Sequence, residues 1–437
     1  MEDTKKYIVA VDLGSSHISA AAGHRDESGR FVVDAVETAE SKDAIKRGRI
    51  INVSDVAFKL SLLFHRLETR LSPSKISKAY VGVSGQSIRS LDYPVVRTIS
   101  MEAPIDATLL DELEMEARNR VLENGLVVFD VIPGDFKVDG RSTEKPCGEY
   151  GSEIRASYRL IVGNEIHKRN IEKAFEQAQM PIAGYICTIH ASASAVLSDE
   201  ERRQGCALVD FGAETTTLAL YKEGSLVAML TIPLGGNNIT RDITSLHVKE
   251  SEAETIKKAY QPQGDASQPV DWDMKDYYFD FSAEEIEEVI TSRMGEIVAN
   301  VKAQIANLSK KCPLSAGITL IGGASLMKGQ KQLLAKETSL GVYNGTLFNI
   351  SLPQGINGIA SVQVIGLLQM GREVCAEPPV VEKKAEPAAP VVDSKPLFPE
   401  EEPVKEPQNR PDESTETKAP LWKKFWDKVS EEMDKEN

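Results

Sequence analysis

The sequence predicts an α/β protein with two similar halves, followed by an extended linker and a short terminal helix. Three observations support this prediction. Short β-branched runs that end in glycine alternate with helical patterns from the N-terminus to about residue 371. An apolar strand that ends in Asp-x-Gly occurs twice, about two hundred residues apart. A composition rich in proline, glutamate and lysine begins near Arg372.

Length and composition limit the classes of protein to consider. A chain of 437 residues with 41% hydrophobic residues is long enough for two or three domains. Its net charge of −15 argues against a nucleic-acid partner, because phosphate binding needs concentrated Lys and Arg. The five cysteines are scattered without a C-x-x-C pair, which excludes a zinc cluster and disfavours a disulfide framework.

The N-terminus "MEDTKKYIVAVDLG" has a short apolar run interrupted by Asp12, which is typical of a strand and not of a signal peptide. No stretch reaches the roughly 20 apolar residues of a transmembrane helix. We therefore expect a cytosolic protein whose contact with a membrane, if any, is peripheral.

The strand signals lie in "YIVAVDLG", "KAYVGVSG", "ALVDFGAETTTLALY" and "GITLIGG". A first amphipathic helix is predicted from Asp106, its expected N-cap, with an apolar face formed by Leu109, Leu110, Leu113, Ala117, Val121 and Leu122. A longer helix follows Ser282, which has capping-box spacing to Glu285; its predicted buried stripe is Ile286, Val289, Ile290, Ile297, Val301 and Ile305.

Two segments, residues 9–23 and 207–221, share one pattern: an apolar strand ending in Asp-x-Gly, a turn with Ser or Thr, and a second strand. Gly14 and Gly212 let the backbone turn tightly and approach a ligand. The turns, with Ser15, Ser16 and Thr215, are expected to direct N–H groups at an anion. Asp12 and Asp210 are placed to hold Mg²⁺, mostly through its waters. Two facing hairpins would bind a polyphosphate from both sides.

A single motif of this kind could occur in any β-hairpin, so the pairing carries the prediction. A third segment, "ITLIGGASLMKG" at residues 318–329, is an apolar strand that runs into Gly322 and Gly323. Glycines at the carboxyl end of a strand are where open α/β sheets bind nucleotides. The alternative for this segment alone is a plain strand–turn–helix corner.

With these motifs the sequence resembles the actin-like ATPase superfamily and, more closely, the FtsA family of bacterial cell-division proteins. The resemblance extends through "VFDVIPGDFKVDG", "LSDEERRQGCALVDFG", "IPLGGNNITRDI" and "ESEAETIKKAY". It implies an actin-like two-domain fold, built from duplicated ribonuclease-H-like halves, with an inserted α+β subdomain and bound ATP and Mg²⁺. It places Gly235, Gly236 and Asn237 near phosphate and ribose, and Glu254 and Lys257 beside the adenosine, opposite Gly322, Gly323, Ala324 and Met327.

The second hairpin departs from the pattern of the superfamily, since Ala213 and Glu214 stand where glycines are common. A carboxylate near the γ-phosphate would repel it unless it is turned away or offset by magnesium. We therefore expect nucleotide binding with slow or absent hydrolysis, and we assign no catalytic residue.

The resemblance also implies the organisation of the chain. The expected parts are a first core subdomain (1–85 and 162–200), an inserted subdomain (86–161), a second core subdomain (201–245 and 316–371), an outer subdomain (246–315), a disordered linker (372–419) and an amphipathic helix (420–437).

By the same resemblance, the inserted subdomain mediates self-assembly into filaments and contact with later division proteins. The outer subdomain receives the C-terminal tail of the tubulin-like ring protein FtsZ, and Arg293 is associated with division function and filament contacts. The implied function is an ATP-binding adaptor, not a metabolic enzyme. It would tether the FtsZ ring to the cytoplasmic side of the membrane at the division septum.

The terminal helix is expected to anchor the protein to a membrane. Pro420 suits the first helical position. An apolar face within an arc of about 140° is formed by Leu421, Trp422, Phe425, Trp426, Val429 and Met433. Lysines gathered in the first half of this helix favour an anionic bilayer surface. Docking in a protein groove is the alternative.

Three other functions are compatible with the same fold, and the sequence disfavours each of them. A small-molecule kinase needs a catalytic carboxylate, for which the sequence offers no candidate outside the two hairpins. A chaperone of the DnaK type needs a β-rich domain after residue 371, where the linker is expected instead. A pilus-assembly adaptor would not be expected to carry a long linker that ends in an amphipathic helix.

Overall fold

The computed structural model describes residues 5–260, 282–309 and 313–378. These residues belong to one compact unit, Met1–Val380. The predicted membrane helix and the predicted linker from residue 379 onward lie outside the described residues. Among the helices of the described ranges, none is long and apolar enough to span a bilayer.

The first half is built on a sheet in which the strands follow the order β12-β7-β1-β2-β3-β18. Strand β1 is antiparallel to β2 and parallel to β7, so a hairpin and a crossover connection meet at the centre of the sheet. These strands are β1 (Ile8–Leu13), β2 (His17–Arg25), β3 (Phe31–Glu40), β7 (Ala79–Val83), β12 (Ile182–Cys187) and β18 (Ile350–Ser351).

The second half repeats this plan in the order β15-β14-β13-β16-β17. Strand β13 is antiparallel to β14 and parallel to β16, as β1 is to β2 and β7. The repetition agrees with the predicted duplication. Its strands are β13 (Cys206–Phe211), β14 (Thr216–Lys222), β15 (Ser225–Ile232), β16 (Ile318–Ile321) and β17 (Val342–Asn344).

Two helices, α4 (Thr188–Val196) and α10 (Val362–Met370), connect the halves. Helix α10 packs on β1, β2 and β7 of the first sheet, and α4 contacts β13 and β14 of the second. The two helices also pack tightly on each other. At their contact, a Cβ on Gly366 would lie 2.3 Å from the carbonyl oxygen of Ala191. Only glycine permits so close an approach of the two backbones.

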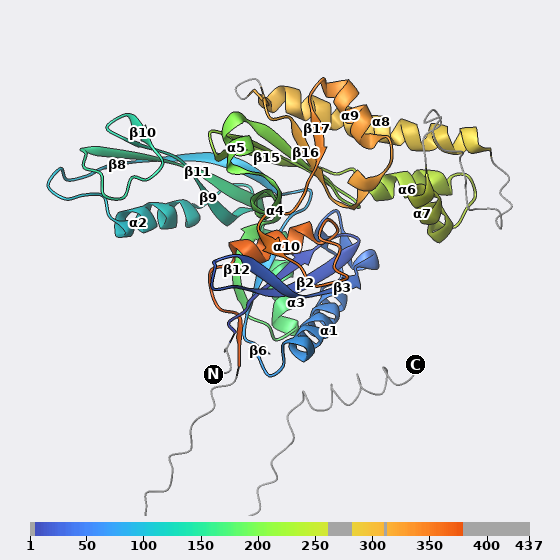
Figure 1. Cartoon of the computed structure of the whole chain (residues 1–437), viewed down its shortest axis with the longest axis horizontal. Coiled ribbons are helices and arrows are strands. Elements are labelled where there is room, and N and C mark those ends of the chain that lie inside the picture. Colours follow the sequence, from blue (N-terminus) through green and yellow to red (C-terminus); the bar gives the residue numbers. More distant parts are fainter. Residues whose placement is uncertain (1–4, 261–281, 310–312, 379–437) are drawn as a thin grey trace, which may run out of the picture. The chain divides into compact units, whose positions relative to one another are not determined.

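Other helices cover the outer faces. In the first half these are α1 (Val53–Leu71) and α3 (Glu165–Gln177), which pack on each other (Figure 1). In the second half they are α5 (Asp199–Gln204), α6 (Gly236–Thr244), α7 (Glu250–Ala259), α8 (Ala283–Leu308) and α9 (Gln330–Thr338). The predicted capping box at the start of α8 is confirmed: Ser282 accepts from the Glu285 N–H while Glu285 accepts from the Ser282 N–H.

The inserted segment forms its own four-stranded sheet, in the order β10-β9-β11-β8, with a separate apolar core. Its elements are β8 (Arg89–Thr98), α2 (Ala107–Arg118), β9 (Leu126–Val138), β10 (Arg141–Thr143) and β11 (Glu153–Asn164). Asp106 caps α2 as predicted, accepting from the Leu109 N–H. The predicted apolar face was too long, however. Helix α2 ends at Arg118, and Val121 beyond it is 88% exposed.

The C-terminal part of the folded unit differs from the predicted division. Helix α10 and β18 lie in the range assigned to the second core subdomain, yet both pack on the first sheet. Order also continues past residue 371, because β19 (Ala376–Glu377) pairs with β6 (Lys75–Ile76) and Cys375 is buried. The reason is physical: α10 is apolar over most of its surface and six of its nine residues are buried, so it is enclosed between layers and does not end the domain.

The contact at Gly366 yields a prediction. Gly366→Ala adds a methyl group against backbone atoms of Ala191 and Ser192 that cannot move aside easily. The free energy of unfolding should fall by about 1–3 kcal/mol, the usual cost of overpacking. Chemical denaturation followed by circular dichroism measures this change.

Gly295→Ala is the matched control, since Gly295 lies inside α8 and a Cβ there meets nothing within 4 Å. Alanine should stabilise that helix by about 0.5–1 kcal/mol. Equal effects of the two substitutions would contradict the close α4–α10 contact.

Candidate nucleotide site

The two predicted phosphate hairpins are both formed. The first joins β1 to β2 through residues 14–16, and the second joins β13 to β14 through residues 212–215. A Cβ on Gly14 would lie 2.6 Å from the carbonyl oxygen of His17, and one on Gly212 would lie 2.9 Å from that of Thr215. Both glycines are therefore required by the close return of the chain. The turns are tight, as the sequence predicts.

Asp12 and Asp210 stand at equivalent positions of β1 and β13, and their charges interact. Burial, and then the neighbouring charge of Asp210, raise the pKa of Asp12 to about 7. Burial raises the pKa of Asp210 to about 6, against a hydrogen bond from Gln363. The charge of Asp210, which disfavours the ionisation of Asp12, would be offset by a bound cation.

Each aspartate receives a hydrogen bond from one of the two connecting helices. Thr188, the first residue of α4, places its hydroxyl 3.5 Å from Oδ1 of Asp12. Gln363 of α10 donates from Nε2 to Oδ2 of Asp210 at 3.0 Å. Neither residue is in the predicted set. Thr188 follows β12, which is parallel to β7, so its place at the carboxyl edge of the first sheet could have been inferred from the sequence. Gln363 follows no motif, so its place in the site could not.

Space around the two carboxylates is kept open by glycines. A Cβ on Gly322 would lie 2.2 Å from Oδ1 of Asp210, and one on Gly82 would lie 3.2 Å from Oδ1 of Asp12. Gly322 has a φ of +87°, which also favours glycine. Gly322 thus keeps space open beside Asp210, which the alternative of a plain strand–turn–helix corner would not require.

The donor set is compatible with magnesium. Oδ1 of Asp210 is buried and has no hydrogen-bond partner, as expected for an atom that faces a cation. Among the described residues no group of three or more His, Cys, Asp or Glu side chains gathers as a metal cluster. Mg²⁺ typically binds through one or two carboxylates, with waters and phosphate oxygens completing its shell. Asp12 and Asp210 fit that pattern.

The start of α6 closes on the second hairpin. The Gly236 N–H donates to the carbonyl of Gly212 at 3.0 Å, and the Asn237 N–H donates to that of Ala213 at 2.6 Å. A Cβ on Gly235 would lie 2.7 Å from the backbone of Ala213. The predicted phosphate and ribose residues therefore adjoin the second phosphate turn.

The predicted adenosine residues also come together. The buried Lys257 ammonium donates to Glu254 at 2.6 Å, to Thr240 at 2.9 Å and to the Gly236 carbonyl at 3.3 Å. Burial lowers the pKa of Lys257, while the Glu254 carboxylate opposes this shift. A Cβ on Gly236 would lie 3.1 Å from that of Ala324. Segments about 70–90 residues apart thus meet beside the second hairpin.

The remaining predicted contacts are less closely gathered. Gly323 and Ala324 begin the 3₁₀ helix η3 (Gly323–Leu326), and Met327, which follows it, packs on the apolar core of the second half. A Cβ on Gly323 would meet nothing within 4 Å, so close packing does not require glycine there. Ser16 bonds its neighbour His17 at 2.8 Å.

Glu214, the residue that departs from the superfamily pattern, is held in place from two sides. It accepts from the Arg47 N–H at 2.5 Å and from the Arg241 guanidinium at 3.1 Å. Its side chain is only 12% exposed. The carboxylate is thus committed to a bond that links the second hairpin to the first half, and it does not stand as a free charge.

Arg47 belongs to a turn, between β4 (Ile45–Lys46) and β5 (Arg49–Ile50), that sequence reasoning missed. Arg47 and Gly48 both have positive φ, and the Gly48 N–H donates to the Ser15 hydroxyl at 2.8 Å. This turn therefore contacts both phosphate hairpins.

Arg293 lies apart from these residues, on α8. Its guanidinium binds both carboxylate oxygens of Asp242, at 2.5 and 3.1 Å, and also contacts Glu296. Because Asp242 is on α6, Arg293 ties α8 to the helix that begins at Gly236.

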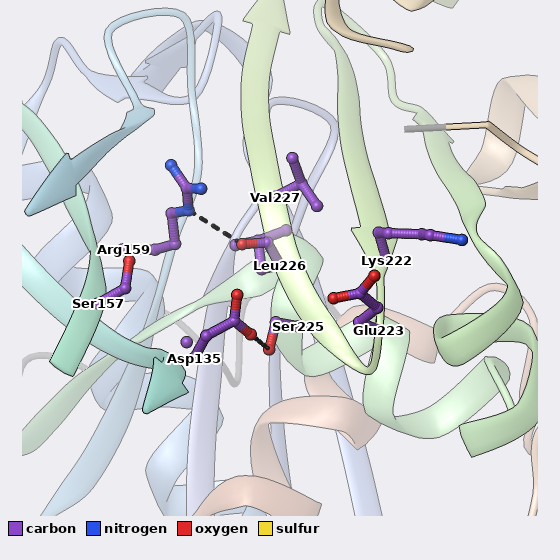
Figure 2. A pocket seen from close by; sticks show the side chains of 9 residues that line it. Asp135, Ser157, Arg159, Lys222, Glu223, Ser225, Leu226 and Val227 are labelled. Carbon is purple, nitrogen blue, oxygen red and sulfur yellow. Dashed lines mark hydrogen bonds between the residues drawn. The ribbon is translucent and has the colours of Figure 1, made fainter. Parts of the chain in front are cut away.

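A pocket of about 190 Å³ lies elsewhere, between β9 and β11 of the inserted sheet and the β14–β15 hairpin (Figure 2). Arg159 donates to the carbonyl of Leu226 at 3.1 Å, and the Ser225 hydroxyl donates to Asp135 at 3.3 Å. None of the predicted nucleotide residues lines this pocket. Its polar contacts join the inserted subdomain to the second half.

The chain was compared with known proteins. Residues 207–365 match the family described as cell division protein FtsA, and residues 85–162 match the SHS2 domain inserted in FtsA. Cell division protein FtsA of Porphyromonas gingivalis is 28% identical, over 84% of this chain and 78% of that protein. Its counterpart in Bacillus subtilis is 27% identical, over 81% of this chain and 82% of that protein.

Among solved structures, a PilM-PilN type IV pilus biogenesis complex aligns with a TM-score of 0.60 at 15% identity, over 83% of this chain and 97% of that one. At this identity the likeness concerns the fold alone. Together the two family models, at residues 207–365 and 85–162, match more than half of the chain. The chain has an actin-like fold and belongs to the FtsA family of cell division proteins.

Proposed function

We propose that this cell division protein binds Mg·ATP between its halves and acts as a polymerising adaptor that tethers the FtsZ ring to the membrane. The observation that carries the nucleotide part is the meeting of Asp12 and Asp210 at the ends of two equivalent strands. Two tight hairpins and the Gly236–Lys257 cluster lie beside this pair.

The residues divide the work of binding. The N–H groups of the two turns would contact phosphate oxygens, and the start of α6 would support the second turn through its bonds to Gly212 and Ala213. Asp12 and Asp210 would hold Mg²⁺, mostly through water, and the cation would neutralise the charge of the polyphosphate. Glu254 and Lys257 would flank the adenosine, facing Gly323, Ala324 and Met327.

We propose an adaptor and not a metabolic enzyme. Glu214 is engaged by Arg47 and Arg241 and so is not poised to activate water. Nucleotide binding would then regulate assembly, with hydrolysis as a slow step.

The proposed protein partners follow the FtsA family. The inserted subdomain would mediate filament contacts and bind later division proteins, and the outer subdomain would bind the FtsZ C-terminal tail. Since Arg293 ties α8 to α6, a partner seated on α8 would influence the helix that begins at Gly236. Titration of a labelled FtsZ-tail peptide against the chain tests this contact.

The first prediction concerns Asp210. Asp210→Ala removes a metal-positioning carboxylate, so the affinity for Mg·ATP should fall by on the order of tenfold or more, equivalent to at least about 1.4 kcal/mol. Isothermal titration calorimetry measures the affinity.

Asp43→Ala is its control, because the Asp43 side chain is 93% exposed and forms an ion pair with the neighbouring Lys46. Unchanged affinity in Asp210→Ala would contradict the placement of the site. Phosphate release by the unchanged chain, followed in the same samples, should stay below about 1 s⁻¹, the low end of ordinary enzymes.

The second prediction concerns pH. Burial and the neighbouring charge of Asp210 raise the pKa of Asp12 to about 7, and burial raises that of Asp210 to about 6. Between about pH 4 and pH 7 these two carboxyls therefore bind more protons in the folded, metal-free protein than in the unfolded chain. Their contribution to the free energy of unfolding should fall as pH rises through this range.

Asp12→Asn removes one of the two charges. In a chelating buffer its free energy of unfolding should exceed that of the unchanged chain by about 1–3 kcal/mol at pH 8 and approach it near pH 4. This difference in free energy is smaller than the full pKa shifts would imply, because water still reaches part of Asp12 and Asp210 and screens their charges. For the exposed control Asp43→Asn, the difference in free energy of unfolding from the unchanged chain should not vary with pH. The same constant difference in Asp12→Asn would refute the raised pKa of Asp12.

The third prediction concerns the terminal helix, which lies outside the described residues. We propose that Leu421, Trp422, Phe425, Trp426, Val429 and Met433 insert into an anionic bilayer. Trp426→Glu should abolish co-sedimentation with anionic liposomes, because it puts a carboxylate on the apolar face. ATP affinity should be unchanged.

Lys428→Gln, on the opposite face, is the control and should weaken sedimentation only in part. Membrane anchoring is refuted if Trp426→Glu still pellets with lipid, or if the unchanged chain never does. Electron microscopy on lipid, with and without ATP, would show whether the bound protein forms filaments.

A further inference from the structure

We propose that Asp130, in β9 of the inserted subdomain, positions Asp12 by holding the start of α4, and that it thereby couples the inserted subdomain to the nucleotide site. The proposal rests on the nucleotide function proposed above. It adds a positioning residue that stands outside every phosphate or adenosine motif.

The first contact is at the N-terminus of α4. Oδ2 of Asp130 accepts the Cys187 N–H at 2.9 Å, and Oδ1 accepts the Val131 N–H at 2.9 Å. Cys187 is the N-cap residue of α4, and its side chain makes no capping bond. The first N–H groups of a helix have no partner within the helix, and a negative charge there is favourable. The inserted subdomain thus supplies an acceptor that the sequence of α4 does not provide.

The second contact leads from α4 to the site. Thr188 directly follows Cys187, and its hydroxyl lies 3.5 Å from Oδ1 of Asp12. A Cβ on Gly82 would lie 2.7 Å from this hydroxyl, so the glycine in β7 leaves the room that Thr188 occupies beside Asp12. A displacement of the first turn of α4 would therefore change the contact between Thr188 and Asp12.

The inserted subdomain bridges both halves at this point. Strand β9 contacts β12 of the first half and β15 of the second. The Met229 N–H of β15 donates to the Ser90 hydroxyl at 2.9 Å, and Arg159 and Asp135 bind the same hairpin (Figure 2). The sulfur of Cys187 lies 3.7 Å from that of Met229. All three parts of the fold meet around Cys187.

A partner that shifts β9 would accordingly change how Asp12 is held, and occupancy of the nucleotide site would change the affinity for that partner by the same factor. Asp130 is the atomic link in this coupling because it contacts the helix that carries Thr188.

The test compares Asp130→Ala and Asp130→Asn with Asp135→Ala in the full chain. Asp135 is the matched control. It is also a carboxylate of β9, but it accepts a hydrogen bond from Ser225 of β15 in the second half and not from α4. Affinity for a fluorescent ATP analogue is measured with Mg²⁺ and with EDTA. Asp130→Ala should lower the Mg²⁺-dependent affinity by about five- to tenfold, the low end of the usual coupling between sites. Asparagine keeps an acceptor and should restore most of it.

Two further measurements separate positioning from general stability. Thr188→Val removes the hydroxyl and keeps the shape, and its effect on Mg²⁺-dependent affinity should not add to that of Asp130→Ala. Amide hydrogen exchange in the nucleotide-free chain should be faster at the start of α4 in Asp130→Ala and unchanged in Asp135→Ala.

The outcomes are distinguishable. Absence of nucleotide binding by the unchanged chain would overturn this proposal together with the proposed function. Binding by the unchanged chain, with Asp130→Ala equal to Asp135→Ala, would overturn this proposal alone. Equal losses with Mg²⁺ and with EDTA would also overturn it. If Asp130→Ala fails to fold, Thr188→Val must still lower the Mg²⁺-dependent affinity while Asp130→Asn keeps most of it, and an unchanged affinity in Thr188→Val would refute the coupling.

Discussion

The backbone contact between α4 and α10 at Gly366 is the constraint on which the rest of the structure depends. Helix α10 packs on the first core sheet, α4 contacts strands of both core sheets, and the two helices pack on each other, so the pair sets the separation of the halves. Each helix also delivers one polar side chain to the site, Thr188 to Asp12 and Gln363 to Asp210. A bulkier residue at position 366 would therefore disturb the packing of α4 on α10 and also displace the carboxylates of Asp12 and Asp210.

The two aspartates explain why such rigidity is useful. In the metal-free protein their burial works against full ionisation of both, and the polar contacts around them hold them in a geometry that a cation would favour. Glu214 would add a third negative charge near this pair. Its bonds to Arg47 and Arg241 instead make it a link between the halves. A substitution that looks unfavourable beside the superfamily pattern is thus balanced by contacts from distant segments.

Sequence alone predicted what depends on local pattern. The strand–Asp-x-Gly hairpins, the caps at Asp106 and Ser282 and the α/β class all follow from short-range propensity and periodicity. It failed where long-range packing decides. Val121 continues a helical period but lies beyond the helix, and α10 belongs with the first sheet although it follows the second in sequence. The turn at Arg47 and the side chain of Gln363 carry no motif, so only the fold brings them to the site.

The end of the described chain has a mechanical consequence. The Tyr7 N–H donates to the carbonyl of Ala376 at 2.8 Å, the Cys375 N–H donates to that of Tyr7 at 2.7 Å, and the Ser77 N–H donates to that of Cys375 at 2.8 Å. Tyr7 directly precedes β1, which carries Asp12 near its far end, about 16 Å away at roughly 3.3 Å per residue. Tension on the chain beyond residue 378 would therefore load the strand that reaches the phosphate hairpin. Mechanical force on the chain, like a bound partner or nucleotide, would thus change the position of Asp12.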